Sequence, residues 1–318
     1  MTTDPATTPP SATVPSTTPA GADIPTGADI PAGPGALTAR DDYLAAADAA
    51  GLLHRSDDGL LFVADAWREP LTGVDQCLVE HADARLLDAA PAFLDVLFAR
   101  FPQCTEAVVR VPGAQDPHPA LAPHLSYLAL PPEAAPAPGT ARAAGPRVVL
   151  DERREHDDAV RDWLRRAMVT AADGRGLTTL PQAVREAADA LLDSPARRTF
   201  LVYADGHDRP AGHATLCVDA HDDPSGTDFV DLVDILVDDP ALRAAATAAL
   251  VRASARLADD LALPLLGNVC HGLDEVGRSG AVVTALEARG WRRTHQYRHA
   301  FRPGAEDAGA PQDQEETP

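Results

Sequence analysis

The sequence predicts an α/β (α+β) protein of two tandem domains, each a mixed, mostly antiparallel sheet flanked by helices. Apolar strands and amphipathic helices alternate along the second half of the chain, from residue 147 to residue 301. Part of the first half repeats this pattern, and a stretch rich in Pro and Ala separates the two. A chain of 318 residues is long enough for two domains of ordinary size.

Three segments are predicted to lie outside the folded domains. Residues 1–35 consist mainly of Thr, Pro, Ala and Gly, contain GADIP twice, and bury too little apolar surface to offset the entropy of ordering. We therefore expect a disordered tail there, an interdomain linker at 131–146, and a second polar tail at 303–318. The folded domains are then 36–130 and 147–302.

The elements of the second domain follow from local patterns. A short apolar run opens it, two amphipathic helices follow, and an Asp-Gly-His-Asp turn separates two strands. A long alanine-rich helix has Asp and Pro at its start, which is typical of a helix N-terminus, and the last helix ends at a Gly. The expected order is a strand at 147–150, helices at 157–170 and 181–192, two strands within 199–220, a strand at 228–237, a helix at 239–261, a strand at 263–269, a helix at 279–290 and a strand at 291–301.

An internal repeat connects the two domains. LVEHADARLL at 78–87 aligns with LVDDPALRAA at 236–245, and without a gap EAVVRVPG at 106–113 falls on PLLGNVCH at 264–271. This predicts two copies of one strand–helix–strand unit, although any two α/β segments can be brought into similar register. The first copy contains no Gly in its loop, and Pro91 interrupts its helix unless the helix starts there, so we expect the N-terminal copy to be degenerate and structural.

Composition excludes several classes of function. The net charge of −21 disfavours binding to nucleic acid and to anionic membrane surfaces. No apolar run approaches the ~20 residues of a membrane span, and the N-terminus lacks the pattern of a secretory signal. Four scattered Cys without a C-x-x-C motif argue against a zinc site and a disulfide framework. These features predict a reduced, cytoplasmic protein without a metal.

The element order over 147–301 resembles that of the GNAT (Gcn5-related N-acetyltransferase) superfamily. The segment LVDDPALRAAATAAL stands where that family has its acyl-CoA pyrophosphate loop, an Arg or Gln followed by spaced Gly residues. Arg243 and Ala248 fit this pattern, and Ala246 replaces the usual Gly. Family members with two such domains in tandem, such as mycothiol synthases, have about this length, and the likeness to them is in architecture only.

The resemblance implies acetyl-CoA or another acyl-CoA as the acyl donor. In such a loop, the free N–H groups of a helix N-terminus bind the diphosphate, and Gly permits close approach. Asp238 and Asp239 would place negative charge at the same point, which leaves open a GNAT-like domain that binds no CoA. The residues implied for donor binding are Leu236, Val237, Arg243, Ala244, Ala246 and Ala248.

Asp231 is the candidate base, because many family members carry a carboxylate six residues before the Val that precedes the loop, here Val237. Strand alternation places Asp231 on one face with Phe229, Val233 and Ile235, and Asp234 on the other. A carboxylate among apolar residues is expected to have a raised pKa, which suits a base. The alternatives are that Asp231 lies at a solvated strand start, and that Asp234 is a buried partner of an Arg or the true acid/base group.

The usual acid of the family, a Tyr in the last helix, is Leu286 here. Tyr297 and His295 on the last strand are the substitutes. One face of that strand is aromatic and basic, so it either lines an acceptor pocket suited to a carboxylate or forms a charged, solvent-facing edge.

The stretch PLLGNVCHG contains the chain's only Asn, next to an adjacent Cys–His pair. Successive side chains of a strand point to opposite faces, so Cys270 and His271 diverge and do not suit a nucleophile–base pair. In the family this strand separates from the preceding one to open the acyl cleft, which Asn268, Cys270 and His271 would line. His213 and His221 are expected on loops or the surface.

The sequence therefore predicts an acyl-CoA-dependent N-acyltransferase that acts on the amine of a small molecule, in a dedicated pathway such as specialised metabolism. Two alternatives remain: a non-catalytic GNAT-fold binding or regulatory protein, and a GNAT-fold enzyme with a carrier-bound acyl donor or other chemistry. A monomer or a homodimer is expected.

Overall fold

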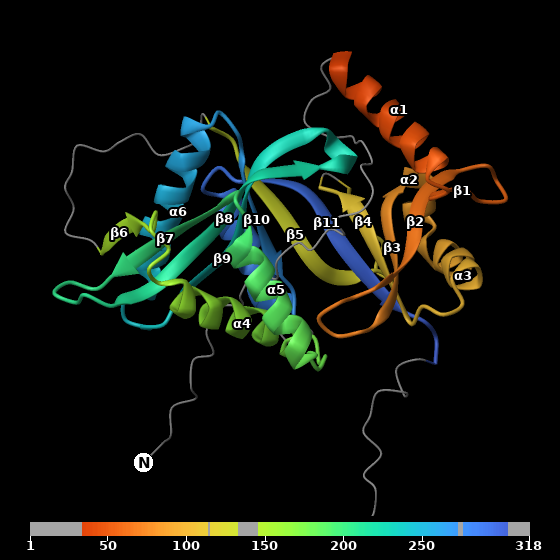
Figure 1. The fold of residues 1–318 in the computed structure, drawn as a ribbon. Helices are drawn as coiled ribbons and strands as arrows, with labels where there is room; N and C mark the ends of the chain where they lie inside the picture. Colours follow the sequence, from red (N-terminus) through yellow and green to blue (C-terminus); the bar gives the residue numbers. More distant parts are fainter. Residues whose placement is uncertain (1–33, 114, 133–145, 273–275, 305–318) are drawn as a thin grey trace, which may run out of the picture.

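The computed structural model describes residues 34–113, 115–132, 146–272 and 276–304. Its strands form one sheet of eleven, in the order β1-β2-β3-β4-β11-β5-β10-β9-β8-β7-β6 (Figure 1). The two predicted tails and the predicted linker lie almost entirely outside the described residues.

The first half of the chain holds five strands and three helices within the described residues. These are α1 (Pro34–Ala49), β1 (Leu53–Arg55), β2 (Leu61–Arg68), β3 (Asp75–Ala82), α2 (Ala84–Asp88), α3 (Ala90–Arg100), β4 (Glu106–Pro112) and β5 (Ala122–Leu130). Pro91 stands in the first turn of α3, where a proline ring costs no hydrogen bond, so it starts this helix rather than interrupting it.

The second half has the predicted order of elements, which confirms the predicted fold class. They are β6 (Arg147–Leu150), α4 (Asp157–Asp173), α5 (Pro181–Asp193), β7 (Arg197–Tyr203), β8 (Pro210–Asp222), a 3₁₀ turn η2 (Asp223–Ser225), β9 (Thr227–Val237), α6 (Arg243–Asp260), β10 (Leu265–Cys270), α7 (Val276–Glu287) and β11 (Arg292–Phe301).

Helix α6 begins four residues later than predicted. Asp239 caps a turn that precedes the helix and not the helix itself. Its Oδ1 accepts the N–H of Ala241 at 2.8 Å, and its carbonyl accepts the N–H of Leu242 at 3.2 Å. The Asp-Pro pair therefore builds the connection before the helix, and the helix starts at Arg243.

The two halves exchange their last strands. β11 of the second half pairs with β4, and β5 of the first half pairs with β10, both antiparallel. At the centre of the sheet β5 and β11 pair with each other, with Ser126 opposite Gln296. On one side of that pair Tyr297 faces Leu125, and on the other side Tyr127 faces His295, so the centre has pseudo-two-fold symmetry.

Helices cover both faces of this sheet. On the α6 face, the core combines side chains of α3 with β2–β4 and side chains of α6 and α7 with β8–β10. On the α4 face, α4 and α5 pack on β7, and α1 packs on β2 through Tyr43, Ala47 and Val63. Alternate residues of β4 decide the faces: Val109 and Val111 belong to the α6 face, and Arg110 between them points to the α4 face.

Each half carries one β-bulge on the strand before its first crossover helix. In β9, Thr215 faces Asp234 and Leu216 faces Leu232, which leaves Val233 as the extra residue. In β3, Val63 faces His81 and Ala64 faces Val79, which leaves Glu80 extra. Both halves therefore contain a bulge at this point of the repeat, whereas the second irregularity of the β8–β9 pairing, between Cys217 and Ala220, has no counterpart in the β2–β3 pairing.

The gap-free alignment of the repeat is wrong where it matches β3 to β9. Leu78 pairs with Val108, and Asp231 pairs with Leu266. The alignment matches Val108 to Leu266 as the structure does, but it matches Leu78 to Leu236 instead of Asp231. The connection between the two strands is longer in the second half, and sequence similarity alone did not reveal the insertion.

Gly212 lets β8 and β9 approach closely beyond the bulge at Val233. A Cβ at this position would lie 2.3 Å from the carbonyl oxygen of Leu236 and 2.8 Å from the Cα of Val237. We expect Gly212→Ala to lower the free energy of unfolding by about 1–3 kcal/mol, because backbone must move to admit the methyl group. Urea unfolding measures this. Gly277→Ala is the control, since nothing lies within 4 Å of its Cβ position, and equal stability of the two variants would contradict the prediction.

Candidate active site

The parallel strands of each half stop pairing before they end. β9 and β10 pair only from Val230–Leu265 to Leu232–Gly267, although β9 continues to Val237 and β10 to Cys270. In the first half, β3 and β4 likewise stop pairing after Val79–Val109. We call these regions the second-half splay and the first-half splay. The separation expected from the family resemblance is therefore present in both halves.

Asp231 lies at the start of the second-half splay. It pairs across the sheet with Leu266 on one side and Cys217 on the other, and its side chain is 8% exposed. Burial raises the pKa of Asp231 to about 7, and among the described residues its Oδ1 has no hydrogen-bonding partner. Asp231 is therefore buried, and the alternative that it lies at a solvated strand start is wrong.

Asp234 points to the same face of the sheet as Asp231, contrary to the prediction. The extra residue Val233 shifts the alternation by one, so Asp234 lies opposite Thr215 on the α4 face, where Asp231 also points. Ile235 in turn packs into the core of the α6 face. The bulge thus brings two carboxylates to one side of the sheet.

The partner of Asp234 is His213 rather than an Arg. Both side chains are fully buried, and His213 Nε2 lies 2.9 Å from Asp234 Oδ2. The other ring nitrogen, Nδ1, lies 2.9 Å from the Thr215 hydroxyl. The prediction that His213 lies on a loop or the surface is wrong, because His213 belongs to β8 and its side chain turns inward under α4.

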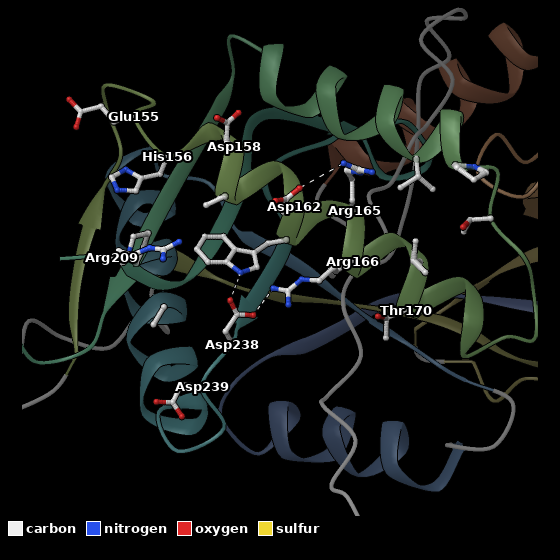
Figure 2. A pocket seen from close by; sticks show the side chains of 18 residues that line it. Glu155, His156, Asp158, Asp162, Arg165, Arg166, Thr170, Arg209, Asp238 and Asp239 are labelled. Atoms are coloured by element: carbon white, nitrogen blue, oxygen red, sulfur yellow. Dashed lines mark hydrogen bonds and ion pairs between the residues drawn. The ribbon is translucent and has the colours of Figure 1, made fainter. Parts of the chain in front are cut away.

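Trp163 of α4 covers this buried pair. Its ring stacks on His213 with centroids 5.1 Å apart and planes at 8°. The indole Nε1–H donates to Asp238 Oδ2 at 2.8 Å, and Arg166 donates to the other oxygen of Asp238 (Figure 2). The carboxylate of Asp238 therefore points to α4 and is paired with a cation, so it does not leave a free negative charge at the start of α6.

A cavity of about 1410 Å³ runs along α4 on this side of the molecule. Trp163 and Asp238 lie in its wall, and several charged side chains of the wall pair with one another, as Arg165 does with Asp162 at 3.8 Å (Figure 2). Other side chains that line it are Glu155, His156, Asp158, Val169, Thr170, Thr179, Pro181, Val184, Arg209 and Asp239. Trp163 lines this cavity and stacks on His213, which does not line it, so the indole ring separates His213 from the cavity. Asp231 and Asn268 do not line the cavity either.

The predicted donor-binding residues lie around the first turn of α6. Its N-cap residue, Leu242, provides no side-chain hydrogen bond to this turn. The N–H of Ala246 bonds within the helix to the carbonyl of Leu242 at 2.8 Å, and the Ala246 methyl is buried in the core, as is Val237. Leu236 packs against the α4–α5 core, whereas Ala244 and Ala248 are exposed. Ala246 thus fills the core rather than facing a bound phosphate.

Tyr297 lies in the first-half splay, not in the second. Its hydroxyl donates to Glu80 Oε2 at 2.6 Å. Arg110 lies 3.6 Å from the same oxygen and also donates two hydrogen bonds, of 2.8 and 2.7 Å, to Asp222 at the end of β8. Burial and the neighbouring Glu80 hold the pKa of Tyr297 well above its usual value. His295 is buried beside this group, so the aromatic and basic face of β11 forms neither an open acceptor pocket nor a solvent-facing edge.

Asn268 takes the place in the second half that Arg110 has in the first. Arg110 pairs with Tyr297 across β4 and β11, and Asn268 pairs with Tyr127 across β10 and β5. Asn268 is half-buried, and the Sγ of Cys270 lies 3.8 Å from its Oδ1. A charged network thus occupies the first-half splay, and a neutral amide occupies the corresponding place in the second.

His271 points away from Asn268 and Cys270, as the strand alternation predicts. Its ring nitrogens lie 2.9 Å from the Ser126 hydroxyl and 2.8 Å from the Ser279 hydroxyl, towards α7 on the α6 face. Burial, with Arg298 and Arg293 nearby, lowers the pKa of His271 to about 4. The divergence of Cys270 and His271 is therefore confirmed, and His271 does not lie on the same side as Asp231.

Across the described residues, no three His, Cys, Asp or Glu side chains gather in a way that would hold a metal ion. All four cysteines are free thiols. No helix among these residues combines the length and the apolar character that a membrane crossing requires.

No family model and no curated protein matches the chain. Solved structures that resemble it include a protein of unknown function from Staphylococcus epidermidis (TM-score 0.44, 8% identity, 74% of this chain and 92% of that chain). A tandem GNAT protein of the clavulanic acid biosynthesis pathway has a TM-score of 0.43 and 13% identity over 86% of this chain and 89% of that chain. The N-myristoyltransferase of Saccharomyces cerevisiae has a TM-score of 0.37 and 12% identity over 76% and 64%.

At these identities and TM-scores, the similarities carry no information about activity. The element order of the second half and the separation of its parallel strands, both observed in this chain itself, are those of the GNAT-like fold that the sequence predicts. A strand–helix–strand unit occurs in both halves, and the two halves share one sheet.

Proposed function

We propose that the protein is an acyltransferase that moves an acyl group from an acyl-CoA to the amine of a small molecule, with its active site in the second half. The observation that carries this proposal is Asp231, a buried carboxylate with a pKa of about 7 where β9 and β10 separate. A base that is half ionised near neutral pH suits the deprotonation of an ammonium group.

In the proposed reaction Asp231 accepts a proton from the acceptor's ammonium group, and the free amine attacks the thioester carbonyl. Val233 lies outside the β8–β9 ladder, so its backbone N–H would be available to polarise that carbonyl. Asp234 stays paired with His213 under Trp163, on the same face of the sheet as Asp231.

The donor's diphosphate is proposed to bind at the first turn of α6. The first N–H groups of a helix have no partners within the helix and carry partial positive charge. Arg243 adds a guanidinium group, which also approaches the carbonyl of Val237 at 3.4 Å. Because Asp238 is paired with Arg166, its charge opposes this binding less than the sequence alone suggests.

Ala244→Glu tests this donor site. Ala244 is exposed in the first turn of α6, so a carboxylate there would repel the diphosphate without altering the core. We expect the Kd for acetyl-CoA, measured by calorimetry, to rise at least about tenfold. Ala190→Glu, which adds the same side chain at an exposed position of α5, should leave the Kd unchanged. An unchanged Kd for Ala244→Glu would place the donor elsewhere.

Calorimetry of the unmodified protein with acetyl-CoA and longer acyl-CoAs tests the proposed function itself. Binding should be followed by thiol release when a suitable small amine is added. Absence of binding at millimolar concentration would contradict the acyl-CoA proposal and favour a non-catalytic GNAT-fold protein.

The free thiols agree with the proposed cytoplasmic location.

A further inference from the structure

The α6 face of the sheet is apolar on both sides of its centre and polar at the centre, where β5 and β11 lie side by side (Figure 1). Val109 and Val111 of β4 belong to the core of the first half. Leu128 of β5 belongs to the core of the second half. Between these two cores, Gln296 of β11 pairs with Ser126 on one side and with Val111 on the other. Residues paired across strands share a face, so both polar side chains lie between two apolar cores.

Two arginines of β11 point to the same face. Arg298 pairs with Val109 of the first core. Arg293 pairs with Leu128 of the second core and is bound to Glu287 of α7, with the nitrogen and oxygen 2.9 Å apart. Burial and the neighbouring Arg293 lower the pKa of Arg298, and no carboxylate among the described residues opposes them. Arg298 is therefore a half-buried cation without a counter-charge, in a chain whose net charge is −21.

Three donor nitrogens on this face of β11 are buried and have no hydrogen-bonding partner within the described part of the chain. They are Nε2 of Gln296 and the Nε atoms of Arg298 and Arg293. Gln296 is only 5% exposed. Buried donors of folded proteins are almost always paired, because an unmade hydrogen bond leaves their desolvation uncompensated. A row of unpaired donors between two apolar cores therefore calls for an acceptor.

His271 does not provide that acceptor. Its ring nitrogens lie 2.9 Å from the Ser126 hydroxyl and 2.8 Å from the Ser279 hydroxyl. Because its pKa is lowered to about 4, the ring is neutral at pH 7 and has one acceptor nitrogen, which a serine hydroxyl already occupies. His271 thus offers Arg298 neither a negative charge nor a free lone pair.

We propose that the centre of the α6 face is a binding site for an oxyanion, the carboxylate or phosphate group of a small molecule. Arg298 would supply the counter-charge, and Gln296 and Arg293 would donate further hydrogen bonds. An oxyanion fits because the unpaired groups are all donors, the excess charge is positive, and a guanidinium matches the oxygens of carboxylate and phosphate groups. Arg298 is only half-buried, so a small anion can reach its side chain from solvent.

This site is separate from the proposed acyl-transfer site. Asp231 points to the α4 face, whereas Gln296 and Arg298 point to the α6 face with Val111 and Val109. The inference therefore goes beyond the proposed function and does not depend on it.

Thermal unfolding of the full-length protein tests the site. The probes are inorganic phosphate and acetate at about 100 mM, each compared with chloride at equal ionic strength. We expect at least one of the two anions to raise Tm by about 3 °C or more, as a ligand well above its Kd does when it binds only the folded state. A larger shift with acetate would identify a carboxylate ligand, and a larger shift with phosphate would identify a phosphate.

Arg298→Met should remove this shift, because Met fills similar volume without a charge. In chloride alone the variant should be at least as stable as the parent, since it no longer buries a cation that lacks a counter-charge. Arg292→Met is the matched control: it removes an exposed arginine from the same strand and should keep the full shift. Gln296→Leu removes only the amide and should reduce the shift, which tests the site independently if Arg298→Met does not fold.

Three results would overturn the inference. Equal shifts for the parent and for Arg298→Met would show a general effect of the salt. No shift with either anion would show that water alone satisfies the buried donors. Clearly lower stability of Arg298→Met in chloride would show that Arg298 already has a partner within the protein. Release of thiol from acyl-CoA enters none of these measurements, so the outcome is independent of the proposed acyltransferase.

Discussion

Asp231→Asn is expected to abolish acyl transfer and, at the same time, to make the protein more stable above neutral pH. An amide cannot accept the ammonium proton, so kcat should fall by about 10²–10⁴-fold. In the unmodified protein kcat should rise as pH increases through about 7, because burial raises the pKa of Asp231 to that value and only the ionised form is a base.

The gain in stability follows from the same pKa. The folded-state pKa of Asp231 lies above its unfolded value of 3.8. Stability is therefore highest when both states are protonated, and it is lost as pH rises from about 4 to about 7. With about 1.4 kcal/mol per pKa unit, ionising Asp231 in the folded protein costs at most about 4 kcal/mol. Asn removes this cost, so the melting temperature of the variant should exceed that of the parent at pH 8 and match it near pH 4.

Asp228→Asn is the matched control, on the same strand. The Asp228 side chain is 72% exposed and lies beside the half-exposed His221, so its replacement should change neither turnover nor the pH dependence of stability appreciably. Normal turnover of Asp231→Asn would remove Asp231 from the role of base. A change in stability that is the same at pH 4 and pH 8 would show that the carboxylate is not desolvated as described.

Arg110→Met is expected to be the most destabilising single substitution at the junction of the two halves. Arg110 donates two hydrogen bonds to Asp222, and its side chain is 9% exposed. Burial alone would raise the pKa of Asp222, but Arg110 holds it well below its usual value. Met fills similar volume and leaves the carboxylates of Asp222 and Glu80 without their cation, a loss of about 3–5 kcal/mol in the free energy of unfolding.

The sign of the pH dependence distinguishes this loss from poor packing. Asp222 stabilises the folded state above its unfolded pKa, and that contribution is lost as pH falls. The loss in the free energy of unfolding of Arg110→Met should therefore be largest at neutral pH and smaller below pH 4, as measured by urea unfolding. Arg68→Met removes an exposed partner of Asp75 and should cost less than about 1 kcal/mol. Equal deficits of the two variants at pH 7 would contradict the prediction.

Local patterns were sufficient for much of the fold. The two-residue period of strands and the 3.6-residue period of helices predicted the element order from β6 to β11. The same two-residue period predicted that Cys270 and His271 diverge, and the low dielectric expected for Asp231 follows from its apolar neighbours in sequence. Each of these inferences depends on residues within a few positions of one another.

The functional assignments that failed depend on contacts between distant segments. A single extra residue, Val233, moved Asp234 to the face of Asp231, and an irregularity of this kind is defined only by the partner strand. His213 is buried because α4 lies over it, and Tyr297 belongs to the first-half splay because β11 pairs with β4. Tyr127 lies far before Asn268 in the chain, so no local pattern places the two residues opposite each other.

The sequence by itself thus determined most elements of the second half and singled out Asp231 as a candidate base, because side-chain periodicity and local polarity are properties of contiguous residues. Only the tertiary structure decided which strands are neighbours and which half contributes the side chains at each splay. It also decided that the charged side chains Glu80 and Arg110 occupy the first-half splay. Strand order depends on hydrogen bonds and side-chain packing between segments far apart in the chain, and two similar halves can satisfy these within their own sheets or, as here, by exchanging β5 and β11.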